Sequence, residues 1–390
     1  MSYQTPNIIL VGLIYDTNLG DTAIYESTLR MIEKITKKNI EIRIIDLYGR
    51  LRPENGICDA FQQKIRRIKR FISQISIDEE YCNNLKKRCE ENIDDNTVAI
   101  IFVGGGLIKY NHQIISNPMV NVLKCADKHH IPVMLSAVGV EGYSGDNPAC
   151  QQLKEALNLP CIKVITTRDD ITTLREHYVT SHIYTSLVAD PACTLFEIYK
   201  KSNQDEKLIG LNVCRGGLFK DYERKLTEDE LIDLWIGVYN IAKASGYKCA
   251  IMTNGFKADY LFAKLLYNSI NDKDVYLFNR PQNVKELVEQ ITKCRAIIAT
   301  RLHAAVIAYS YNIPCVSLVW NNKQVFFGKS IGREELFISD KDITPNNTWD
   351  KIISQIVTKT NYDDNYINST QKEISMFLNK FVLKKEMKWD

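Results

Sequence analysis

The sequence predicts an α/β protein made of two Rossmann-like domains that face a cleft. Three observations lead to this prediction. The chain has 390 residues, more than the roughly 250 to 300 at which a single hydrophobic core stops growing. Short, continuous apolar runs alternate with helical patterns in both halves, as in parallel sheets covered by helices on both faces. A polar stretch without apolar periodicity at 197–208 separates the two halves.

The first half contains five candidate strands, each rich in β-branched and apolar residues. Between the first two, Ile24, Met31, Ile32 and Ile35 recur at helical spacing, and Asp21 is expected to cap that helix. The first unit therefore reads as a strand, a glycine turn and a helix. The expected strands are 7–14, 40–47, 97–103, 132–140 and 163–168.

The second half repeats this pattern after the polar stretch. Val284, Leu287, Val288 and Ile291 form a helical apolar stripe, and the expected strands are 208–213, 249–253, 275–278, 296–299 and 314–320. The predicted domains are 1–196 and 209–345, followed by C-terminal helices at 346–390. We expect these last helices to pack back on the first domain.

Composition limits the partners and the compartment. With 50 basic and 47 acidic residues, no global positive field favours nucleic acid. Eleven cysteines without a CxxC pair suit reduced thiols, and neither a zinc site nor any other bound metal is expected. The apolar run at 8–14 is too short to span a membrane, so we expect a cytoplasmic protein. The basic stretch at 64–70 is consistent with peripheral contact with the inner membrane face, but a solvated helix face is the preferred explanation.

Two glycine-containing segments follow predicted strands. Asn18, Gly20 and Asp21 lie between the first strand and its helix, where backbone amides can approach a ligand; a tight turn capped by Asp21 is the alternative. Gly104, Gly105 and Gly106 follow the strand at 97–103. The carboxyl end of such a strand is where open α/β sheets bind ligands, and three glycines allow several N–H groups to face a substrate. We assign both segments to the cleft.

The strongest candidate is the segment Arg301, Leu302 and His303, which joins a strand to an apolar helix. A guanidinium can bind phosphate or carboxylate through two hydrogen bonds, and the helix start favours negative charge. His303 can exchange a proton beside such an anion. A structural salt bridge and a histidine at a helix start are the alternative reading. Arg168 and Arg215 also follow strands and are further candidates for the anion, although each has an aspartate nearby in sequence.

Taken in order, these motifs resemble those of the polysaccharide pyruvyltransferase family. They are NLGDTAI at 18–24, GGG at 104–106, RD at 168–169, ADPA at 189–192, RLHAA at 301–305 and the segment 314–323 from Pro314 to Lys323. The resemblance covers about residues 8 to 335. It implies a GT-B-like fold and the transfer of pyruvate from phosphoenolpyruvate to two hydroxyls of a sugar, with a cyclic ketal and phosphate as products.

The resemblance also implies residue roles, with the two glycine-containing segments on the acceptor side of the cleft. Arg301 and Arg168 would bind the donor together with Leu302, His303 would be the catalytic acid or base, and Lys323 matches a lysine of the family. Trp320 stands where the family usually has tyrosine. No cofactor is implied besides the donor substrate, phosphoenolpyruvate. The expected acceptor is a sugar in a polysaccharide, exopolysaccharide or capsule precursor, lipid-linked if the membrane contact is real.

Two other functions fit parts of the pattern. A GT-B glycosyltransferase would use a nucleotide sugar and place an acidic residue near the ribose, a role open to Glu286 or Glu289. A sugar- or anion-binding relative without activity would keep the fold alone. The presence of both Arg301 and His303 argues against loss of activity.

Overall fold

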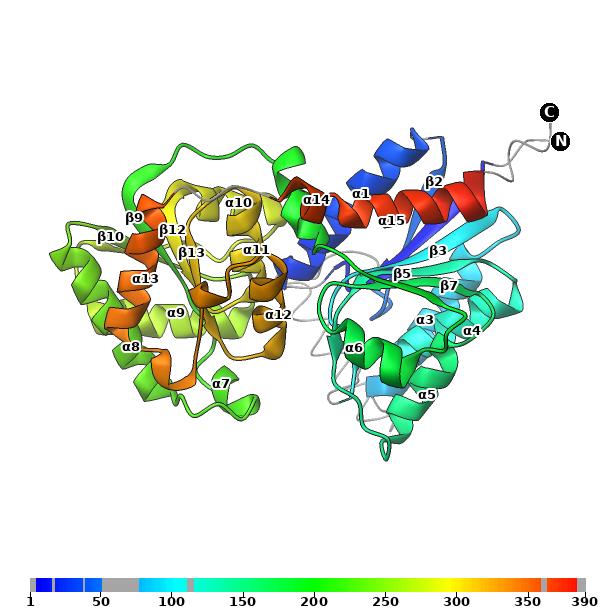
Figure 1. Ribbon diagram of the computed structural model, residues 1–390, viewed down its shortest axis with the longest axis horizontal. Helices are drawn as coiled ribbons and strands as arrows, with labels where there is room; N and C mark the ends of the chain where they lie inside the picture. The colour runs from blue at the N-terminus through cyan, green and yellow to red at the C-terminus, as the bar shows by residue number, and fades with distance from the viewer. Residues whose placement is uncertain are drawn as a thin grey trace. The chain divides into compact units, whose positions relative to one another are not determined.

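The computed structural model describes residues 5–15, 18–37, 39–50, 77–110, 116–358 and 363–383; for 77–82, 116, 117 and 340 only the backbone is described. The chain forms two compact units (Figure 1). Unit 1 comprises Met1–Asp16, Ile24–Pro191 and Asn368–Asp390. Unit 2 comprises Thr17–Ala23 and Ala192–Ile367. The basic stretch at 64–70 lies outside the described residues.

Unit 1 is built on a six-stranded, all-parallel sheet. Its central strands are buried over their whole length, which explains why they appear in the sequence as continuous apolar runs. A separate two-stranded sheet is formed by β4 (Ile108–Lys109), which follows β3, and β6 (Val140–Glu141), which follows β5. The strand order is β2 (Glu41–Asp46), β1 (Asn7–Gly12), β3 (Thr97–Val103), β5 (Val133–Val138), β7 (Ile162–Thr167) and β8 (Tyr184–Leu187).

Helices cover both faces of this sheet (Figure 1). One face packs against α1 (Leu19–Thr36), α15 (Ser369–Leu378) and the π-helical turn η5 (Asn379–Leu383). The other face packs against α3 (Ile77–Asn92), α4 (Ser116–Lys128) and α5 (Pro148–Leu157). The short helices α6 (Ile171–Thr173) and η1 (Leu174–Tyr178) precede β8. The prediction that C-terminal residues pack back on the first domain is confirmed by Phe377, which is 1% exposed against this sheet.

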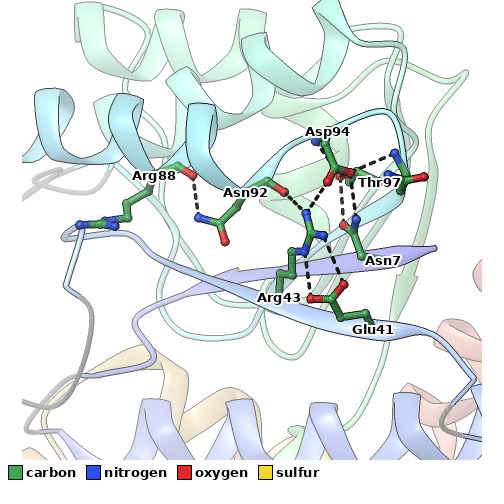
Figure 2. A network of polar contacts seen from close by, with 8 residues as sticks. Asn7, Glu41, Arg43, Arg88, Asn92, Asp94 and Thr97 are labelled. Atoms are coloured by element: carbon green, nitrogen blue, oxygen red, sulfur yellow. Dashed lines mark hydrogen bonds and ion pairs between the residues drawn. The ribbon is translucent and has the colours of Figure 1, made fainter. Parts of the chain in front are cut away.

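A polar network ties together the amino ends of three strands in unit 1 (Figure 2). Arg43 donates through Nε to Glu41 at 3.1 Å and through Nη1 to Asp94 at 2.7 Å. Asp94 also accepts from Asn7 Nδ2 at 3.0 Å, and Thr97 Oγ1 donates to Asn7 Oδ1 at 3.0 Å. Four of the five residues lie at or before the starts of β1, β2 and β3, and Arg43 is the third residue of β2. The network therefore belongs to the end of the sheet opposite the glycine segments, and we assign it a structural role.

Unit 2 contains a second six-stranded parallel sheet. In chain order its strands are arranged 3-2-1-4-5-6, the order of dinucleotide-binding Rossmann folds. The prediction of two Rossmann-like domains is thus confirmed. The order in space is β11 (Val275–Leu277), β10 (Lys248–Met252), β9 (Asp205–Asn212), β12 (Cys294–Ala299), β13 (Cys315–Val319) and β14 (Phe337–Ser339).

The helices of unit 2 also occupy both faces of the sheet. α8 (Glu228–Ala244), α9 (Lys257–Ile270) and α13 (Pro345–Val357) bury their apolar residues against one face. α10 (Val284–Lys293) and α11 (Leu302–Ser310) contact strands β9, β12 and β13. The remaining elements are η2 (Pro191–Glu197), α7 (Leu218–Asp221), α12 (Asn322–Ser330), η3 (Glu334–Leu336), η4 (Asp340–Asp342) and α14 (Asp364–Ile367).

The structure divides the chain differently from the domain limits expected from sequence. The units separate at Pro191/Ala192, so the polar stretch at 197–208 lies inside unit 2. Hydrogen bonds explain this, because Ser202 N donates to Thr292 Oγ1 at 3.0 Å and Gln204 Nε2 donates to Cys294 O at 2.8 Å. The C-terminal helices are likewise divided: α13 belongs to unit 2 and α15 to unit 1. Within the described ranges, no helix is both long and apolar enough to span a membrane.

Candidate active site

The strongest candidate segment lies at the topological switch point of unit 2. Strands β9 and β12 are neighbours, and the last residues of both strands, Asn212 and Ala299, are paired. β10 and β11 lie on one side of this pair, and β13 and β14 lie on the other. Because ligands of open α/β sheets bind at the carboxyl ends of strands where the order reverses, Arg301 is in the position expected of a ligand-binding residue.

Arg301 is held by a buried carboxylate that is 42 residues away in the chain. Its Nε donates to Asp259 Oδ2 at 2.8 Å, and its Nη2 donates to Asp259 Oδ1 at 2.7 Å. The Asp259 side chain is 0% exposed and that of Arg301 is 14% exposed. The guanidinium carbon also lies 5.2 Å from the centre of the Phe256 ring. The orientation of Arg301 is thus fixed before any ligand arrives.

The charge of Arg301 is retained in this buried position. Burial on its own would lower the pKa of the guanidinium, but the charge of Asp259 and its two hydrogen bonds raise that pKa above the ordinary arginine value. Asp259 is itself positioned by the backbone, because Arg215 N donates to its Oδ1 at 3.0 Å. The salt bridge that was the structural alternative for Arg301 therefore exists. It leaves 14% of the Arg301 side chain exposed and does not exclude a ligand.

Thr300 and Trp320 form the wall beside this ion pair. Trp320 Nε1 donates to Thr300 O at 2.6 Å, and Gln324 Nε2 donates to the same oxygen at 3.2 Å. The Trp320 ring lies 5.7 Å from the guanidinium carbon of Arg301 and 5.2 Å from Lys323 Nζ. The structure thus brings Arg301 and Lys323 to the same indole. Such contacts orient the cations without neutralising them.

His303 lies in the first turn of α11, and Gly20 packs against its ring. A Cβ atom built on Gly20 would lie 2.1 Å from His303 Nδ1. The sequence suggested that Gly20 forms a turn. It does not, because α1 already begins at Leu19. The expected N-cap role of Asp21 is wrong for the same reason. Asp21 lies in the first helical turn, where Asn18 Nδ2 donates to its Oδ2 at 2.8 Å.

Arg215 is placed differently from Arg301. Its guanidinium forms an ion pair with Asp221, and both side chains are close to half exposed. Its contribution to the site is the backbone N–H bond to Asp259 described above. A role of the Arg215 side chain in donor binding stays a prediction.

In unit 1, the glycine triplet follows β3 at the point where β1 and β3 are neighbours. Gly104 and Gly105 have φ of 36° and 78°, in the range that favours glycine. A Cβ on Gly104 would lie 2.1 Å from Ile24 Cγ2 of α1. Gly104 N donates to Ser136 O at 3.0 Å, so this N–H serves the fold. Backbone conformation and close packing thus account for Gly104, while the acceptor role proposed for Gly104, Gly105 and Gly106 stays a prediction.

Arg168 belongs to unit 1 and is also paired. Its Nη1 donates to Asp190 Oδ2 at 2.5 Å, and the two side chains are 5% and 2% exposed. The sequence grouped Arg168 with Arg301 as donor-binding arginines. In the structure they belong to different units, and a contact of Arg168 with the donor stays a prediction.

The neighbour of Arg168 is a buried acid close to Gly139, whose N–H donates to Gly105 O of the glycine triplet at 2.7 Å. Asp169 Oδ1 accepts from Val140 N and from Thr167 Oγ1, both at 2.8 Å. Its Oδ2 has no hydrogen-bond partner among the described residues and lies 3.1 Å from the position of a Cβ on Gly139. Burial raises the pKa of Asp169, although Arg168 and the hydrogen bonds oppose the shift.

Sequence reasoning missed Asp259 and Asn212, which bond to Arg301, and Asn254, which bonds to Asn212. Each lies at or just after the carboxyl end of a strand or at the start of the following helix, and that position was the available signal. Among the described residues, no group of three His, Cys, Asp or Glu side chains is arranged to hold a metal ion.

Comparisons with known proteins agree with this picture. The family model for polysaccharide pyruvyl transferase matches residues 18–322, and no curated protein matches the sequence. UDP-GlcNAc 2-epimerase from Methanocaldococcus jannaschii, solved with UDP-GlcNAc and UDP, is 14% identical with a TM-score of 0.56 and covers 95% of this chain and 99% of its own. The enzyme from Neisseria meningitidis, solved with UDP-GlcNAc, is 12% identical with a TM-score of 0.56 and coverages of 96% and 99%.

A further similar structure is S. aureus MnaA with UDP, which is 10% identical with a TM-score of 0.59 and coverages of 96% and 97%. At such identities the likeness concerns the fold alone. The fold shared with these proteins is of the GT-B type, with two Rossmann-like domains.

Proposed function

The chain belongs to the polysaccharide pyruvyl transferase family, and on this premise we propose that it transfers pyruvate from phosphoenolpyruvate to two hydroxyls of a sugar. The products are a cyclic pyruvate ketal and phosphate. The observation that carries this proposal is Arg301, whose largely buried side chain is held rigidly by Asp259 at the switch point of unit 2. It stands directly before the helix that bears His303.

The chemistry requires proton transfer and charge neutralisation. The methylene carbon of phosphoenolpyruvate gains one proton, and C2 then bears developing positive charge. One sugar hydroxyl adds to C2 and loses its proton; the second hydroxyl also forms a bond to C2 and loses its proton as the C2–O bond to phosphate breaks. One of the two released protons replaces the one consumed, and the other goes to the oxygen of the departing phosphate, which leaves as hydrogen phosphate. We assign the first proton transfer to His303 and neutralisation of the phosphate to Arg301 and Lys323.

The nucleotide-sugar alternative has less support from the residues proposed for it. Glu286 accepts from Gln282 N at 2.9 Å and from Asn283 Nδ2 at 2.8 Å, and so serves the start of α10. Glu289 lies 3.9 Å from Lys285 on the exposed face of the same helix. Both acids therefore have structural partners. Because similar structures were solved with UDP, binding of UDP is the measurement that separates the two functions.

The test is phosphate release from phosphoenolpyruvate by the purified protein, with and without a panel of galactosides, glucosides and N-acetylhexosamines. We expect release that depends on one acceptor, together with a matching mass gain on that sugar. His303→Ala should abolish turnover while donor binding persists, and His129→Ala, at an exposed position, should leave turnover unchanged. Tight UDP binding without phosphate release would favour the glycosyltransferase.

The acceptor we propose is a sugar of a polysaccharide, exopolysaccharide or capsule precursor on the cytoplasmic side of the membrane. A lipid-linked acceptor would agree with the basic stretch at 64–70, which lies outside the described residues. Neutralising its lysines and arginines should weaken binding to anionic liposomes. Unchanged binding would remove the argument for membrane contact and leave the pyruvyl transfer proposal intact.

A further inference from the structure

A chain of two asparagine side chains leads away from the start of α11. Arg301 N donates to Asn212 Oδ1 at 3.2 Å. Because a backbone N–H can only donate, the Asn212 atom that it contacts has to be the amide oxygen. The Nδ2 of Asn212 is thereby directed to the next residue of the chain.

That next residue is Asn254, at the carboxyl end of β10. Asn212 Nδ2 donates to Asn254 Oδ1 at 2.8 Å, so the accepting atom is again an oxygen. The orientation of the second amide therefore follows from the first, and the outer end of the chain is the NH₂ group of Asn254. The backbone N–H of Arg301 therefore sets the orientation of both amides. We call the pair Asn212 and Asn254 the asparagine relay.

The NH₂ group of Asn254 is buried and unsatisfied within the described part of the chain. Asn254 is 1% exposed, and its Nδ2 has no hydrogen-bond partner among the described residues. Leaving a buried donor unsatisfied is costly, and such groups in native proteins usually meet a water, an ion or a ligand. The hydroxyl of the preceding residue, Thr253, is also buried without a partner in the described part of the chain.

The surroundings of Asn254 indicate what kind of ligand would meet it. Asn254 O accepts from Leu19 N at 3.1 Å, and the next residue after Leu19 is Gly20, which packs against His303. Phe256, two residues further along the chain, lies beside the Arg301 guanidinium. Asn254 is thus linked through Asn212 to the start of α11, and its neighbours in the chain and across it contact His303 and the Arg301 guanidinium.

The Arg301–Asp259 pair carries no net charge, so cationic charge at the head of α11 is partly offset. A phosphate bound there needs hydrogen-bond donors in addition to Arg301. We propose that Asn254 Nδ2 is one of these donors and binds an oxygen of the phosphate group of the donor substrate. The ligand identity rests on the proposed function, while the donor character of the site rests on the asparagine relay.

Asn254→Asp tests this with the least change in shape. The aspartate keeps an oxygen for Asn212 Nδ2 and replaces only the free NH₂ group by an anionic oxygen. Affinity for inorganic phosphate and for phosphoenolpyruvate, measured by calorimetry, should fall about ten- to a hundredfold, as expected for loss of a hydrogen bond to a charged group. For each ligand, the dissociation constant of the variant divided by that of the native protein should decrease as pH falls toward the aspartate pKa, because the carboxyl then regains a proton.

Asn312→Asp is the matched control, because it introduces the same charge at an exposed position just beyond α11. If Asn254→Asp does not fold, Asn254→Ala serves instead and should weaken phosphate binding about tenfold. Equal phosphate affinity in native protein and variant would overturn the proposal, since the amide then meets only water. If the variant bound pyruvate more weakly but bound phosphate as tightly as the native protein, the phosphate assignment would equally be wrong. If the native protein binds neither phosphate nor phosphoenolpyruvate, the proposed function itself fails.

Discussion

Replacing Asp259 by asparagine should destabilise unit 2 strongly, because it removes the counter-charge of a buried arginine. The carboxylate is 0% exposed, and the Arg301 side chain is 14% exposed, so solvent hardly screens the pair. Both guanidinium bonds, at 2.8 and 2.7 Å, need acceptors, and an asparagine supplies only one oxygen. Breaking a buried ion pair on one side costs about 3 to 5 kcal/mol, and we expect a loss of that size.

The assay is chemical unfolding followed by tryptophan fluorescence. Three of the four tryptophans lie in unit 2, so their signal reports on this unit; they are Trp235, Trp320 and Trp349. Asp221→Asn is the control. It breaks an exposed ion pair of the same type with Arg215, which should cost about 0 to 1 kcal/mol.

A ligand should partly restore the asparagine variant. An anion bound at Arg301 supplies the missing negative charge, so inorganic phosphate should raise the unfolding midpoint of Asp259→Asn more than that of the native protein. If Asp259→Asn is no less stable than Asp221→Asn, the buried pair does not hold Arg301, and the account of the site given above is wrong.

Gly20→Ala places a methyl group 2.1 Å from His303 Nδ1, and turnover should fall at least about tenfold while donor affinity changes less; unchanged turnover would separate His303 from the reaction. Burial raises the pKa of Asp169, so the native state holds its proton to higher pH than the unfolded chain, and stability due to this group is present below about pH 4 and lost as pH rises. Asp169→Asn should therefore gain stability relative to native protein as pH rises above about 4, measured by urea unfolding; a pH-independent difference would refute the shift. A hydrogen bond with Cys89 lowers the pKa of Cys125 to about 7, so iodoacetamide should modify Cys125 with a midpoint near pH 7, and a midpoint near 9 would contradict that contact.

The sequence was sufficient for strands that are buried on both faces. β3 lies at 97–103, as predicted, because nearly every residue of TVAIIFV is buried. β8 and β14 were missed since they are short edge strands with partly or largely exposed residues, and such strands carry no continuous apolar run. The start of α1 was placed too late, because the N–H of Leu19 is satisfied by Asn254, a residue far away in the chain.

In the candidate site too, the sequence predicted residues that belong to a local pattern and missed those that depend on contacts distant in the chain. Arg301 and His303 were found because they follow a predicted strand directly, which is a local pattern. Asp259, which fixes Arg301, lies 42 residues away, and no spacing rule connects the two. In the sequence, Asn212 and Asn254 cannot be distinguished from other residues at strand ends. Their contacts follow from the position of β9 between β10 and β12 in the sheet.

The neutral Arg301–Asp259 pair also bears on how the proposed enzyme would release its product. A phosphate leaving group keeps its charge after the C2–O bond breaks, so a site of high net positive charge would retain the product as firmly as the donor. A guanidinium that is already balanced by Asp259 loses part of that attraction. Discrimination between the donor substrate and the phosphate product then depends more on oriented hydrogen-bond donors, such as the amide of Asn254, because hydrogen bonds are sensitive to geometry. Under the proposed function, removing Asp259 should therefore strengthen binding of inorganic phosphate, and weaker binding would mean that Asp259 acts chiefly by orienting Arg301.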